Sequence, residues 1–538
     1  MDRRTFLKSA AASAATPLFS QPGRRRPNIV VILADDMGYS DAGCYGGDID
    51  TPNLDALAAN GLRFTNAYST ARCGPSRNCL LTGYYAQQTA ADVMTPGNVP
   101  AWTRYLPEYL KPYGYHSYHS GKWHIKCTAL EGAGFQDSYM LLDENRYFAP
   151  RLQHLNESPL PEVKPGDGFY VTKSIAQHGV QFLKQHAANH AEDPFFLYLA
   201  FTSPHFPLHA LPEDIARYEG RFSEGWDAVR EKRSSRMRRM GLVNCELSPM
   251  EPQERPRWST PDPELSEKIG AGEVTRAVPW STLTPEQKAF QRKKMAIHAA
   301  MISRMDAEIG SVVEQLRAMK QLDNTVILFL SDNGASAEQI IRGDGHDSAA
   351  SAGSAGSYLC LGPGWASAAN TPFRLHKSYL HEGGIASPLI VHWPAGIREK
   401  GGMRHDACHF IDVLPTVLTL AGGDPMTAAQ TGAPALSGKS LVPAFGNERI
   451  RREFLYFNHS NNRAIRSGDW KLVALGENGP WELYNVARDR SEQHNLIASH
   501  RDRAERLAQL WSDRDKDFVR VRESAPPSTK PLLKRLSW

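Results

Sequence analysis

The segment NIVVILADD, Asn28 to Asp36, decides the fold class of this 538-residue chain. Its apolar run shows no alternation with polar residues, which is typical of a strand buried on both faces of a helix-covered parallel sheet. TVILFLSDNG, from Thr325, repeats the pattern of an apolar run that ends in polar residues. FFLYLAFTSPHFP, from Phe195, and the shorter GYHSYHSGKWH, from Gly114, indicate two further strands of this kind. Together these segments predict an α/β domain.

A helix is predicted between two of these strands. From Met295 to Met319, apolar side chains recur at helical spacing. Open, doubly wound sheets bind their ligands at the carboxyl ends of their strands. We therefore expect the polar residues that end the four strands to converge on one site.

The chain is longer than one core usually holds, so we expect two domains. The predicted fold class is α/β, with a large doubly wound sheet, mixed but mostly parallel, over residues 27–440 and a smaller C-terminal α+β domain over 450–525. In the small domain, FLYFNHSNNRAIRSGDWKLVAL and WELYNVARD indicate short strands, and Glu492 to Trp511 a terminal helix. Residues 206–290 and 347–376 are typical of surface insertions, although a long loop beside a site can also form its wall.

The first residues, MDRRTFLKSAAASAATPLFS, carry paired Arg3 and Arg4, then Phe-Leu-Lys and a short Ala-rich run. This pattern predicts a twin-arginine signal peptide over residues 1–22, with an amphipathic helix as the alternative. We therefore expect a bacterial protein that the twin-arginine translocase exports to the periplasm or beyond. The balance of 62 basic and 58 acidic residues does not indicate a nucleic-acid partner, and no apolar run is long enough for membrane insertion.

Carboxylates and an amide follow two of the predicted strands. Asp35 and Asp36 come after one, and Asp332 and Asn333 after the other. Singly, such residues cap helices and turns more often than they bind metals. Together they offer the hard oxygen ligands that Ca²⁺ or Mg²⁺ prefers, which predicts a site for a hard divalent cation.

Five basic side chains follow strand ends or the segment around Cys73. Each of them alone is typical of an ordinary polar residue. Beside a divalent cation, they would form a pocket suited to an oxyanion such as sulfate or phosphate. They are Arg77, Lys122, His124, His205 and Lys377.

Cys73, in ARCGPSRNCLLTG, does not suit this chemistry. The seven cysteines show no spacing typical of a metal knuckle or a disulfide framework. Cys73 could be a small buried residue, a disulfide partner of Cys79 or a thiol nucleophile. A thiolate is a poor companion for a hard metal, so the conflict calls for another interpretation.

CGPSRNCLLTG resembles the modification signature, Cys-x-Pro-Ser-Arg followed by Leu-Thr-Gly, of the type I formylglycine-dependent sulfatases. These enzymes form an arylsulfatase-like family of the alkaline phosphatase superfamily. PNIVVILADDMGYSD, GKWH, SPHFP, SDNG, FRLHKSYLHEGGIASPLIVHWP and WELYNVARD extend the resemblance from about Asn28 to Leu510. It implies an alkaline phosphatase-like fold, hydrolysis of an aryl or carbohydrate sulfate ester, and oxidation of Cys73 to formylglycine by a separate formylglycine-generating or sulfatase-maturating enzyme.

The resemblance also implies a role for each candidate residue. One hydroxyl of the hydrated aldehyde attacks sulfur, while the metal, Lys122 and Lys377 hold the sulfate oxygens. Arg77 positions the formylglycine, and His205, with Lys377, protonates the departing alcohol oxygen. His124 takes the proton of the second hydroxyl, so that sulfate is released. The implied Ca²⁺ ligands are Asp35, Asp36, Cys73, Asp332 and Asn333.

Two other functions compete with a sulfatase. Phosphonate monoester and phosphodiester hydrolases of the same superfamily also use formylglycine, but they usually carry histidine where Asn333 stands. A sulfated-glycan binding protein on an inactive scaffold would have lost some of the catalytic candidates, and all of them are present. We expect substrate specificity to reside in residues 206–290 and 347–376 and in the small domain.

Overall fold

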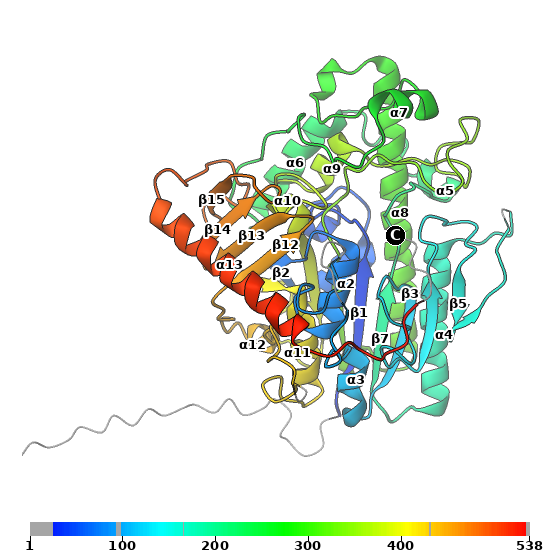
Figure 1. Ribbon diagram of the computed structural model, residues 1–538. Coiled ribbons are helices and arrows are strands. Elements are labelled where there is room, and N and C mark those ends of the chain that lie inside the picture. Colours follow the sequence, from blue (N-terminus) through cyan, green and yellow to red (C-terminus); the bar gives the residue numbers. More distant parts are fainter. Residues whose placement is uncertain (1–24, 93–97, 165, 430–431, 534–538) are drawn as a thin grey trace, which may run out of the picture.

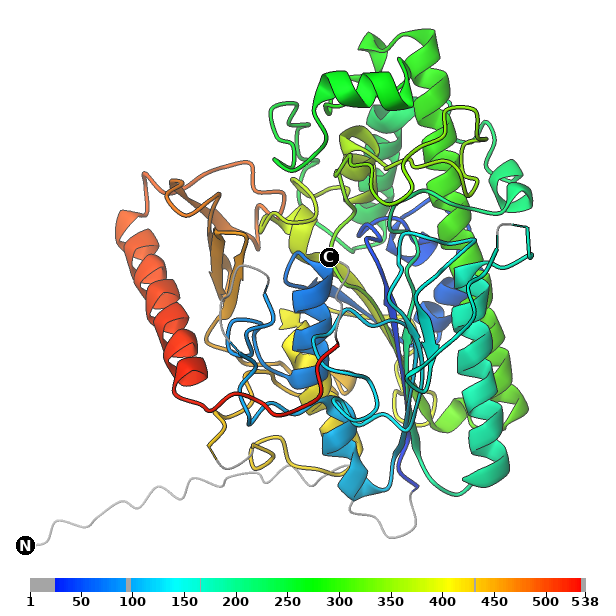
Figure 2. The same ribbon diagram turned by 45° about the vertical axis from the view of Figure 1, so that its right-hand side comes forward.

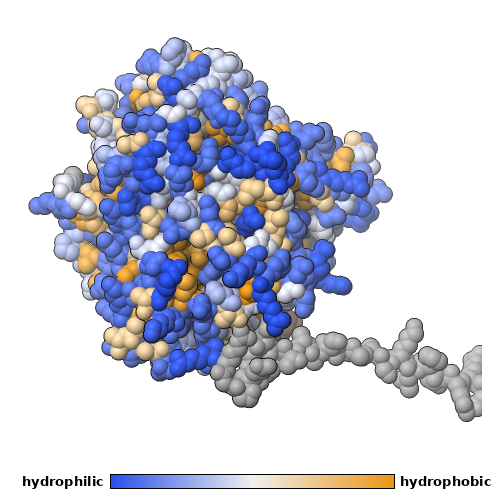
Figure 3. All heavy atoms as spheres, turned by 180° about the vertical axis from the view of Figure 1, so that it is seen from behind, coloured by the Kyte–Doolittle hydropathy of each residue, from blue (hydrophilic) through white to orange (hydrophobic). Residues whose placement is uncertain are grey.

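The structure, a computed structural model, describes residues 25–92, 98–164, 166–429 and 432–533 (Figure 1). The predicted signal peptide, residues 1–22, lies outside this part of the chain. Among the described helices, none combines the length and the apolar character that a membrane span requires. Figure 3 shows that hydrophilic residues cover most of the face behind that of Figure 1.

Four parallel strands form the centre of the larger sheet, and all four were predicted. β1 (Asn28–Ala34) lies between β7 (Phe195–Ala200) and β8 (Thr325–Ser331) and runs parallel to both. β3 (His116–Lys122) pairs with β7, again in parallel. Every residue of β1, β7 and β8 is buried, as expected for a sheet covered on both faces. The carboxyl ends of the four strands therefore meet at one edge of the sheet.

Strand β9 (Ala386–His392) makes the sheet mixed, because it runs antiparallel to both β8 and β2 (Leu62–Tyr68). Within the described residues the larger sheet has eleven strands, and most of its pairs are parallel, which confirms the predicted fold class. Its other strands are β4 (Asp137–Leu141), β5 (Gln153–Leu155), β6 (Ser158–Pro159), β10 (Gly402–Arg404) and β11 (Cys408–His409).

Helices cover both faces of the larger sheet (Figure 2). Val30 and Ile32 of β1 contribute to a core shared with α1, α4 and α8, whereas Ile29 and Val31 contribute to a core shared with α2, α3 and α11. Alternate residues of one strand thus bury against opposite helix layers, as in a doubly wound fold. The bounds are α1 (Pro52–Ala59), α2 (Cys73–Thr82), α3 (Leu106–Leu110), α4 (Val171–Asn189), α8 (Pro285–Ala318), α11 (Val413–Leu420) and α12 (Val442–Phe445).

The segments 206–290 and 347–376 are only partly the surface insertions that their composition predicts. Trp226 is completely buried, and so is Trp365. Arg233 is buried as well and forms an ion pair with Asp41 at 2.8 Å, which ties the first segment to the chain that follows β1. The helices here are α5 (Pro212–Ala216), α6 (Gly225–Arg239), α7 (Asp262–Ile269), α9 (Pro363–Ala369) and, just beyond, α10 (Glu382–Ile385).

A separate antiparallel sheet forms the core of the smaller C-terminal α+β part. It consists of β12 (Leu455–His459), β13 (Asn462–Ser467), β14 (Trp470–Ala474) and β15 (Trp481–Asn485), paired in that order. Helix α13 (Arg501–Glu523) packs on this sheet, with Leu507 in a shared apolar cluster. Short 3₁₀ helices cover Gly43–Tyr45, Lys111–Tyr113, Trp280–Thr282, Leu322–Asn324 and Phe410–Asp412.

Helix α8 begins at Pro285, whereas the apolar spacing predicts a start at Met295. The Thr284 hydroxyl accepts a hydrogen bond from the Gln287 backbone N–H at 3.2 Å, and the Gln287 side chain bonds back to Thr284. This capping box sets the start of the helix ahead of its apolar stripe.

The terminal helix α13 begins at Arg501, not at the predicted Glu492, and ends at Glu523, not at Trp511. Glu492 has a φ of 57°, which a helix does not allow. Its carboxylate lies 2.8 Å from the Lys471 ammonium group, so this residue belongs to a buried ion pair rather than to a helix.

Candidate active site

The loops that follow β1, β3, β7 and β8 bring the predicted site residues together at the carboxyl edge of the larger sheet. Asp35 and Asp332 directly follow β1 and β8, and Lys122 ends β3. Cys73 is the first residue of α2, which itself follows β2. The residues that meet here are Asp35, Asp36, Cys73, Arg77, Lys122, His124, His205, Asp332, Asn333 and Lys377.

Ion pairs join the carboxylates of this site to its basic residues. An Asp35 carboxylate oxygen lies 2.6 Å from Lys122 Nζ and 3.3 Å from Arg77 Nη2. Arg77 also donates to Asp332 Oδ2 from Nε and Nη2, at 3.1 and 2.7 Å. Lys377 Nζ lies 2.8 Å from Asp36 Oδ1. All these side chains are buried, so the pairs are shielded from water and salt.

Two oxygens at the site are buried without a hydrogen bond or an ion pair among the described residues. They are Asp35 Oδ1 and the amide Oδ1 of Asn333. Asp35, Asp332 and Cys73 each place one potential ligand atom within 4.8 Å of the other two. Buried polar atoms normally have partners, and a hard cation prefers such oxygens. The donor set therefore fits a Ca²⁺-like ion.

Lys122 carries its charge in spite of its burial. Burial alone would lower the pKa of Lys122, but the Asp35 carboxylate outweighs this effect and raises the pKa well above its usual value. Burial would in turn raise the pKa of Asp35, and Lys122, with His205 and Arg77, holds it below the usual range. The site therefore presents a fixed cation next to an ionised carboxylate at neutral pH.

The two histidines have different surroundings. Burial lowers the pKa of His124 to about 3, which keeps its imidazole neutral at neutral pH. His205 donates from Nδ1 to the Phe206 carbonyl at 2.6 Å and places Nε2 3.7 Å from Asp36 Oδ2. Because a carbonyl can only accept, Nδ1 of His205 carries a proton, and this hydrogen bond holds the ring in one orientation.

Two carboxylates at the site were missed by the sequence analysis. Glu144 lies 2.8 Å from Lys122 Nζ, and Glu338 lies 3.3 Å from Lys377 Nζ. Burial would raise the pKa of Glu144, but Lys122 and His124 lower it to about 2. Glu144 comes three residues after the end of β4, so the strand-end rule, applied to this strand too, could have found it.

A cavity of about 350 Å³ opens onto these residues. Its lining combines the predicted Cys73, His124, His205 and Lys377 with residues from more distant segments. A ligand in it can reach the nucleophile candidate and both histidines at once. The distant lining residues are Trp258, Arg342, His459 and Ser460.

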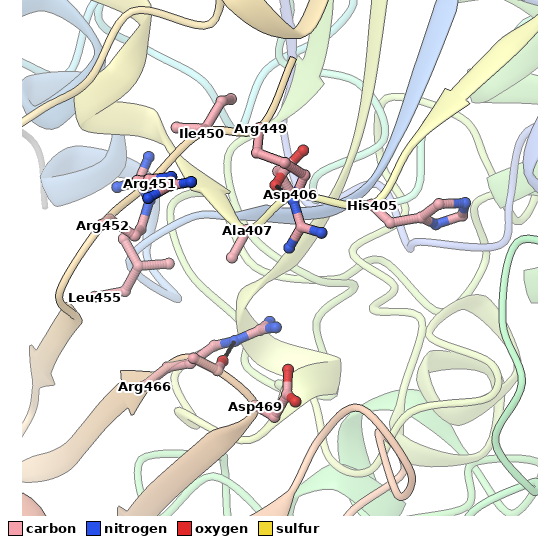
Figure 4. A pocket seen from close by; sticks show the side chains of 11 residues that line it. His405, Asp406, Ala407, Arg449, Ile450, Arg451, Arg452, Leu455, Arg466 and Asp469 are labelled. Atoms are coloured by element: carbon pink, nitrogen blue, oxygen red, sulfur yellow. Dashed lines mark hydrogen bonds and ion pairs between the residues drawn. The ribbon is translucent and has the colours of Figure 1, made fainter. Parts of the chain in front are cut away.

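Another hollow, of about 430 Å³, lies between residues 405–407 and 449–469 (Figure 4). Its lining is rich in arginine, but Arg449 pairs with Asp406 at 2.7 Å and Arg452 with Asp412 at 2.5 Å. No cysteine or serine is among its lining residues, so it offers no nucleophile. The cavity at Cys73 is the better candidate for the reaction site.

A doubly wound sheet whose strand ends carry an oxygen-rich cation site beside a cationic pocket suits a hydrolase that acts on the ester of an oxyanion. A family model described as sulfatase matches residues 27–423, and one described as N-sulphoglucosamine sulphohydrolase, C-terminal, matches 373–516. The chain belongs to the sulfatase family of the alkaline phosphatase superfamily. It is a sulfuric ester hydrolase, an enzyme that hydrolyses sulfate esters.

Curated relatives span nearly the whole chain. An uncharacterized sulfatase of Schizosaccharomyces pombe is 31% identical, covering 91% of this chain and 94% of its own. An arylsulfatase of Klebsiella aerogenes is 31% identical over 79% of this chain and 91% of its own. An N-acetylglucosamine-6-O-sulfatase of Bacteroides thetaiotaomicron is 25% identical over 94% and 89%.

Solved structures share the fold. Ps i-CgsB in complex with k-i-k-neocarrahexaose superposes with a TM-score of 0.66 at 24% identity, covering 92% of this chain and 94% of its own. A protein in complex with its substrate D-glucosamine-2-N,6-O-disulfate superposes with a TM-score of 0.62 at 20% identity, covering 92% and 98%. These likenesses confirm the alkaline phosphatase-like fold.

Proposed function

We propose that this sulfatase acts on an aryl or carbohydrate sulfate ester with a formylglycine made from Cys73 and with a bound Ca²⁺. The observation that carries the proposal is the place of Cys73. It is the first residue of α2, is 3% exposed, and lies with Asp35 and Asp332 in a cluster of potential metal ligands at the base of the cavity. A formylglycine-generating or sulfatase-maturating enzyme would supply the modification.

The hydrated aldehyde would supply one hydroxyl that attacks sulfur and a second whose deprotonation lets sulfate depart. His124 lines the cavity beside residue 73, and because burial lowers its pKa, its imidazole is unprotonated at neutral pH and in the form that can accept that second proton. Arg77 follows residue 73 by one turn of α2, and its bonds to Asp332 and to the Lys122 carbonyl hold it in place. From there Arg77 would orient residue 73 within the cluster.

Lys122 and Lys377 would hold the oxygens of the sulfate group. Burial opposes the charge of Lys377, but Asp36 and Glu338 raise its pKa above its usual value. Two buried cations are therefore available where negative charge develops on the sulfate oxygens. When the bond between sulfur and the alcohol oxygen breaks, the alcohol oxygen takes a proton from the pair formed by Lys377 and His205.

Asp35, Asp36, Asp332, Asn333 and residue 73 would hold the Ca²⁺. Bound there, the ion supplies positive charge beside the sulfate oxygens. Asn333 contributes a neutral carbonyl oxygen, which suits Ca²⁺, whereas a histidine in this position would suit a transition metal. The asparagine therefore favours a sulfatase over the phosphodiesterase alternative.

The N-terminal pattern supports a proposal about location. The paired Arg3 and Arg4 and the Ala-rich run that follows favour export by the twin-arginine translocase to the periplasm or beyond. An enzyme in that compartment meets sulfate esters outside the cytoplasm.

The proposal is tested on protein produced in its own host. The mass of the peptide that contains residue 73 is expected to show formylglycine. Cys73→Ala is expected to lower the rate of sulfate release from an aryl sulfate by about a thousandfold or more, because it removes the nucleophile. The circular dichroism spectrum is expected to stay unchanged. Cys79→Ala is the matched control, because Cys79 is a buried core residue of the same helix.

Unmodified cysteine at residue 73 in fully active protein would overturn the formylglycine mechanism. An aryl phosphodiester hydrolysed faster than the aryl sulfate would favour the phosphodiesterase alternative. Full activity in protein freed of metal by chelation would contradict the Ca²⁺ site.

A further inference from the structure

The outer wall of the active-site cavity comes from three segments that are far apart in the sequence. Trp258 belongs to the segment 206–290, and Arg342 to the loop that follows β8. His459 and Ser460 come from the smaller sheet. None of these residues takes part in the chemistry proposed above, so they are candidates for recognising the rest of the substrate.

The tip of the β12–β13 hairpin adds polar groups to this wall. Its two loop residues, Ser460 and Asn461, have φ angles of 50° and 65°, as a two-residue type I′ turn requires. His459 Nδ1 lies 2.7 Å from an Asp92 carboxylate oxygen, and its Nε2 lies 3.0 Å from Ser460 Oγ. Both ring nitrogens of His459 are thus engaged, and the tip presents the Ser460 hydroxyl, held by this imidazole, which can bond to a hydroxyl group of a ligand.

Trp258 adds an apolar surface. Its side chain is 42% exposed, one of four large hydrophobic side chains exposed among the described residues. Its indole N–H donates to Glu338 Oε1, and the Arg72 guanidinium lies 5.7 Å from its ring centre. These contacts hold the ring in place, so its exposed surface can pack against the C–H face of a sugar ring.

Arg342 adds a charge that has no counterpart in the part of the chain that the structure describes. Its side chain is exposed, and it makes no ion pair or hydrogen bond there. Its loop is anchored nonetheless, because Asp344 pairs with Arg146 and, at 3.3 Å, with Arg151. Lys122 and Lys377, by contrast, have carboxylate partners, and under the proposed function they bind the reacting sulfate.

We propose that the substrate is a sulfated saccharide that bears a second anionic group, a sulfate or a carboxylate, and that Arg342 binds this group. The sugar ring that carries it packs on Trp258, and its hydroxyls bond to the hairpin tip. This inference rests on the proposed function, because it assigns the reacting sulfate to the site at residue 73. A simple aryl sulfate would occupy only the part of the cavity around residue 73 and would leave Arg342 without a partner.

The test compares three substrates that share one disaccharide: a monosulfate, a disulfate, and a monosulfate with a uronate carboxylate. Release of sulfate gives kcat and KM for wild type, Arg342→Gln, Arg342→Lys and Arg398→Gln. We expect wild type to prefer at least one of the doubly anionic substrates by about tenfold or more, as a charge-assisted hydrogen bond implies. Whether the disulfate or the uronate is preferred identifies the second group.

Arg342→Gln is expected to abolish this preference by raising KM for the doubly anionic substrate, with kcat unchanged. Arg342→Lys is expected to keep part of the preference. Arg398→Gln removes an equal charge from an exposed loop after β9 and does not line the cavity, so it is expected to keep the wild-type preference. An equal loss on all three substrates in Arg342→Gln, or a wild-type preference for the monosulfate, would overturn the proposal.

The same assays distinguish a failure of the proposed sulfatase function from a failure of the proposal about Arg342. Wild type that releases sulfate from none of the three saccharides and from no aryl sulfate would overturn the proposed function itself. Wild type that hydrolyses an aryl sulfate but none of the saccharides would overturn only the proposal about Arg342.

Discussion

At the scale of single residues, Asn333 shows how one amide can serve two neighbours. Its Nδ2 donates to Asp36 Oδ1 at 2.6 Å and to the Gly334 carbonyl at 2.9 Å. These bonds assign the nitrogen side of the amide, and so they point Oδ1 toward the cluster. The oxygen is buried and has no hydrogen-bond donor among the described residues. An unpaired buried carbonyl costs free energy unless a cation binds it.

Asn333→Ala is therefore expected to weaken Ca²⁺ binding about tenfold or more, because it removes one neutral oxygen ligand. Calorimetric titration of chelated protein with CaCl₂ measures the affinity, and the rise of Tm with Ca²⁺ reports binding independently of activity. Asn189→Ala, at the exposed end of α4, is the matched control. Equal Ca²⁺ affinity in Asn333→Ala and wild type would exclude this oxygen as a ligand.

At the scale of secondary-structure elements, a buried ion network joins α10 to the smaller sheet. Glu382, in α10, lies 3.0 Å from Lys471 of β14 and 2.8 Å from Arg490. It also accepts from the Tyr68 hydroxyl at the end of β2 at 3.0 Å. The network thus connects the strand that leads to Cys73 with the sheet that carries the hairpin tip.

Glu382→Gln is expected to lower the free energy of unfolding by about 3–5 kcal/mol at neutral pH, because it leaves the buried Arg490 without its counter-charge and leaves Lys471 with Glu492 alone. Burial would raise the pKa of Glu382, but Lys471 and Arg490 lower it from 4.5 to about 2. The stabilisation is therefore present above pH 4.5 and is lost as the pH falls toward 2. Scans of Tm against pH should show the difference between variant and wild type shrinking over this window.

Glu505→Gln, on the exposed side of α13, removes the same charge without a buried partner and is expected to keep the wild-type Tm. A Glu382→Gln variant as stable as wild type at pH 7 would show that the network adds no stability.

The same scale shows what the sequence could predict. The location of the site could be predicted from the strand ends, because parallel strands place their carboxyl ends at one edge of the sheet, however far apart the strands are in the chain. Asp35, Lys122 and Asp332 could therefore be grouped without knowledge of any contact. Trp258 and Arg342 could not, since they reach the cavity through loops whose course depends on tertiary packing. The predicted boundaries of α8 and α13 were wrong, because a capping box at Thr284 and an ion pair of Glu492 set the local structure there instead of the apolar spacing.

At the scale of the whole molecule, the C-terminal segment after α13 leaves the smaller sheet and packs against loops of the larger domain. After α13, drawn in red, the chain crosses to the blue and cyan part of the structure (Figure 2). Pro527 pairs with Pro100, and Leu532 with Cys127, in isolated bridges. The backbone N–H of Thr128 donates to the Pro531 carbonyl at 3.0 Å, four residues after His124. The C-terminal segment therefore supports the loop that carries one of the cavity histidines.

Truncation after Ala525 is expected to loosen this loop. It removes the carbonyls that accept from the backbone N–H groups of Thr128 and Ala101, the latter at 2.8 Å from Pro526. Since each such bond contributes about 1 kcal/mol, amide exchange at these two positions should accelerate about fivefold or more. Hydrogen exchange followed by mass spectrometry measures this, with peptides of β1 as the internal control because the C-terminal segment does not touch that strand in the described residues. A lower kcat on aryl sulfate is expected as well, because His124 loses its support. Unchanged exchange at Thr128 and Ala101 would mean that the loop holds its shape without the returning chain.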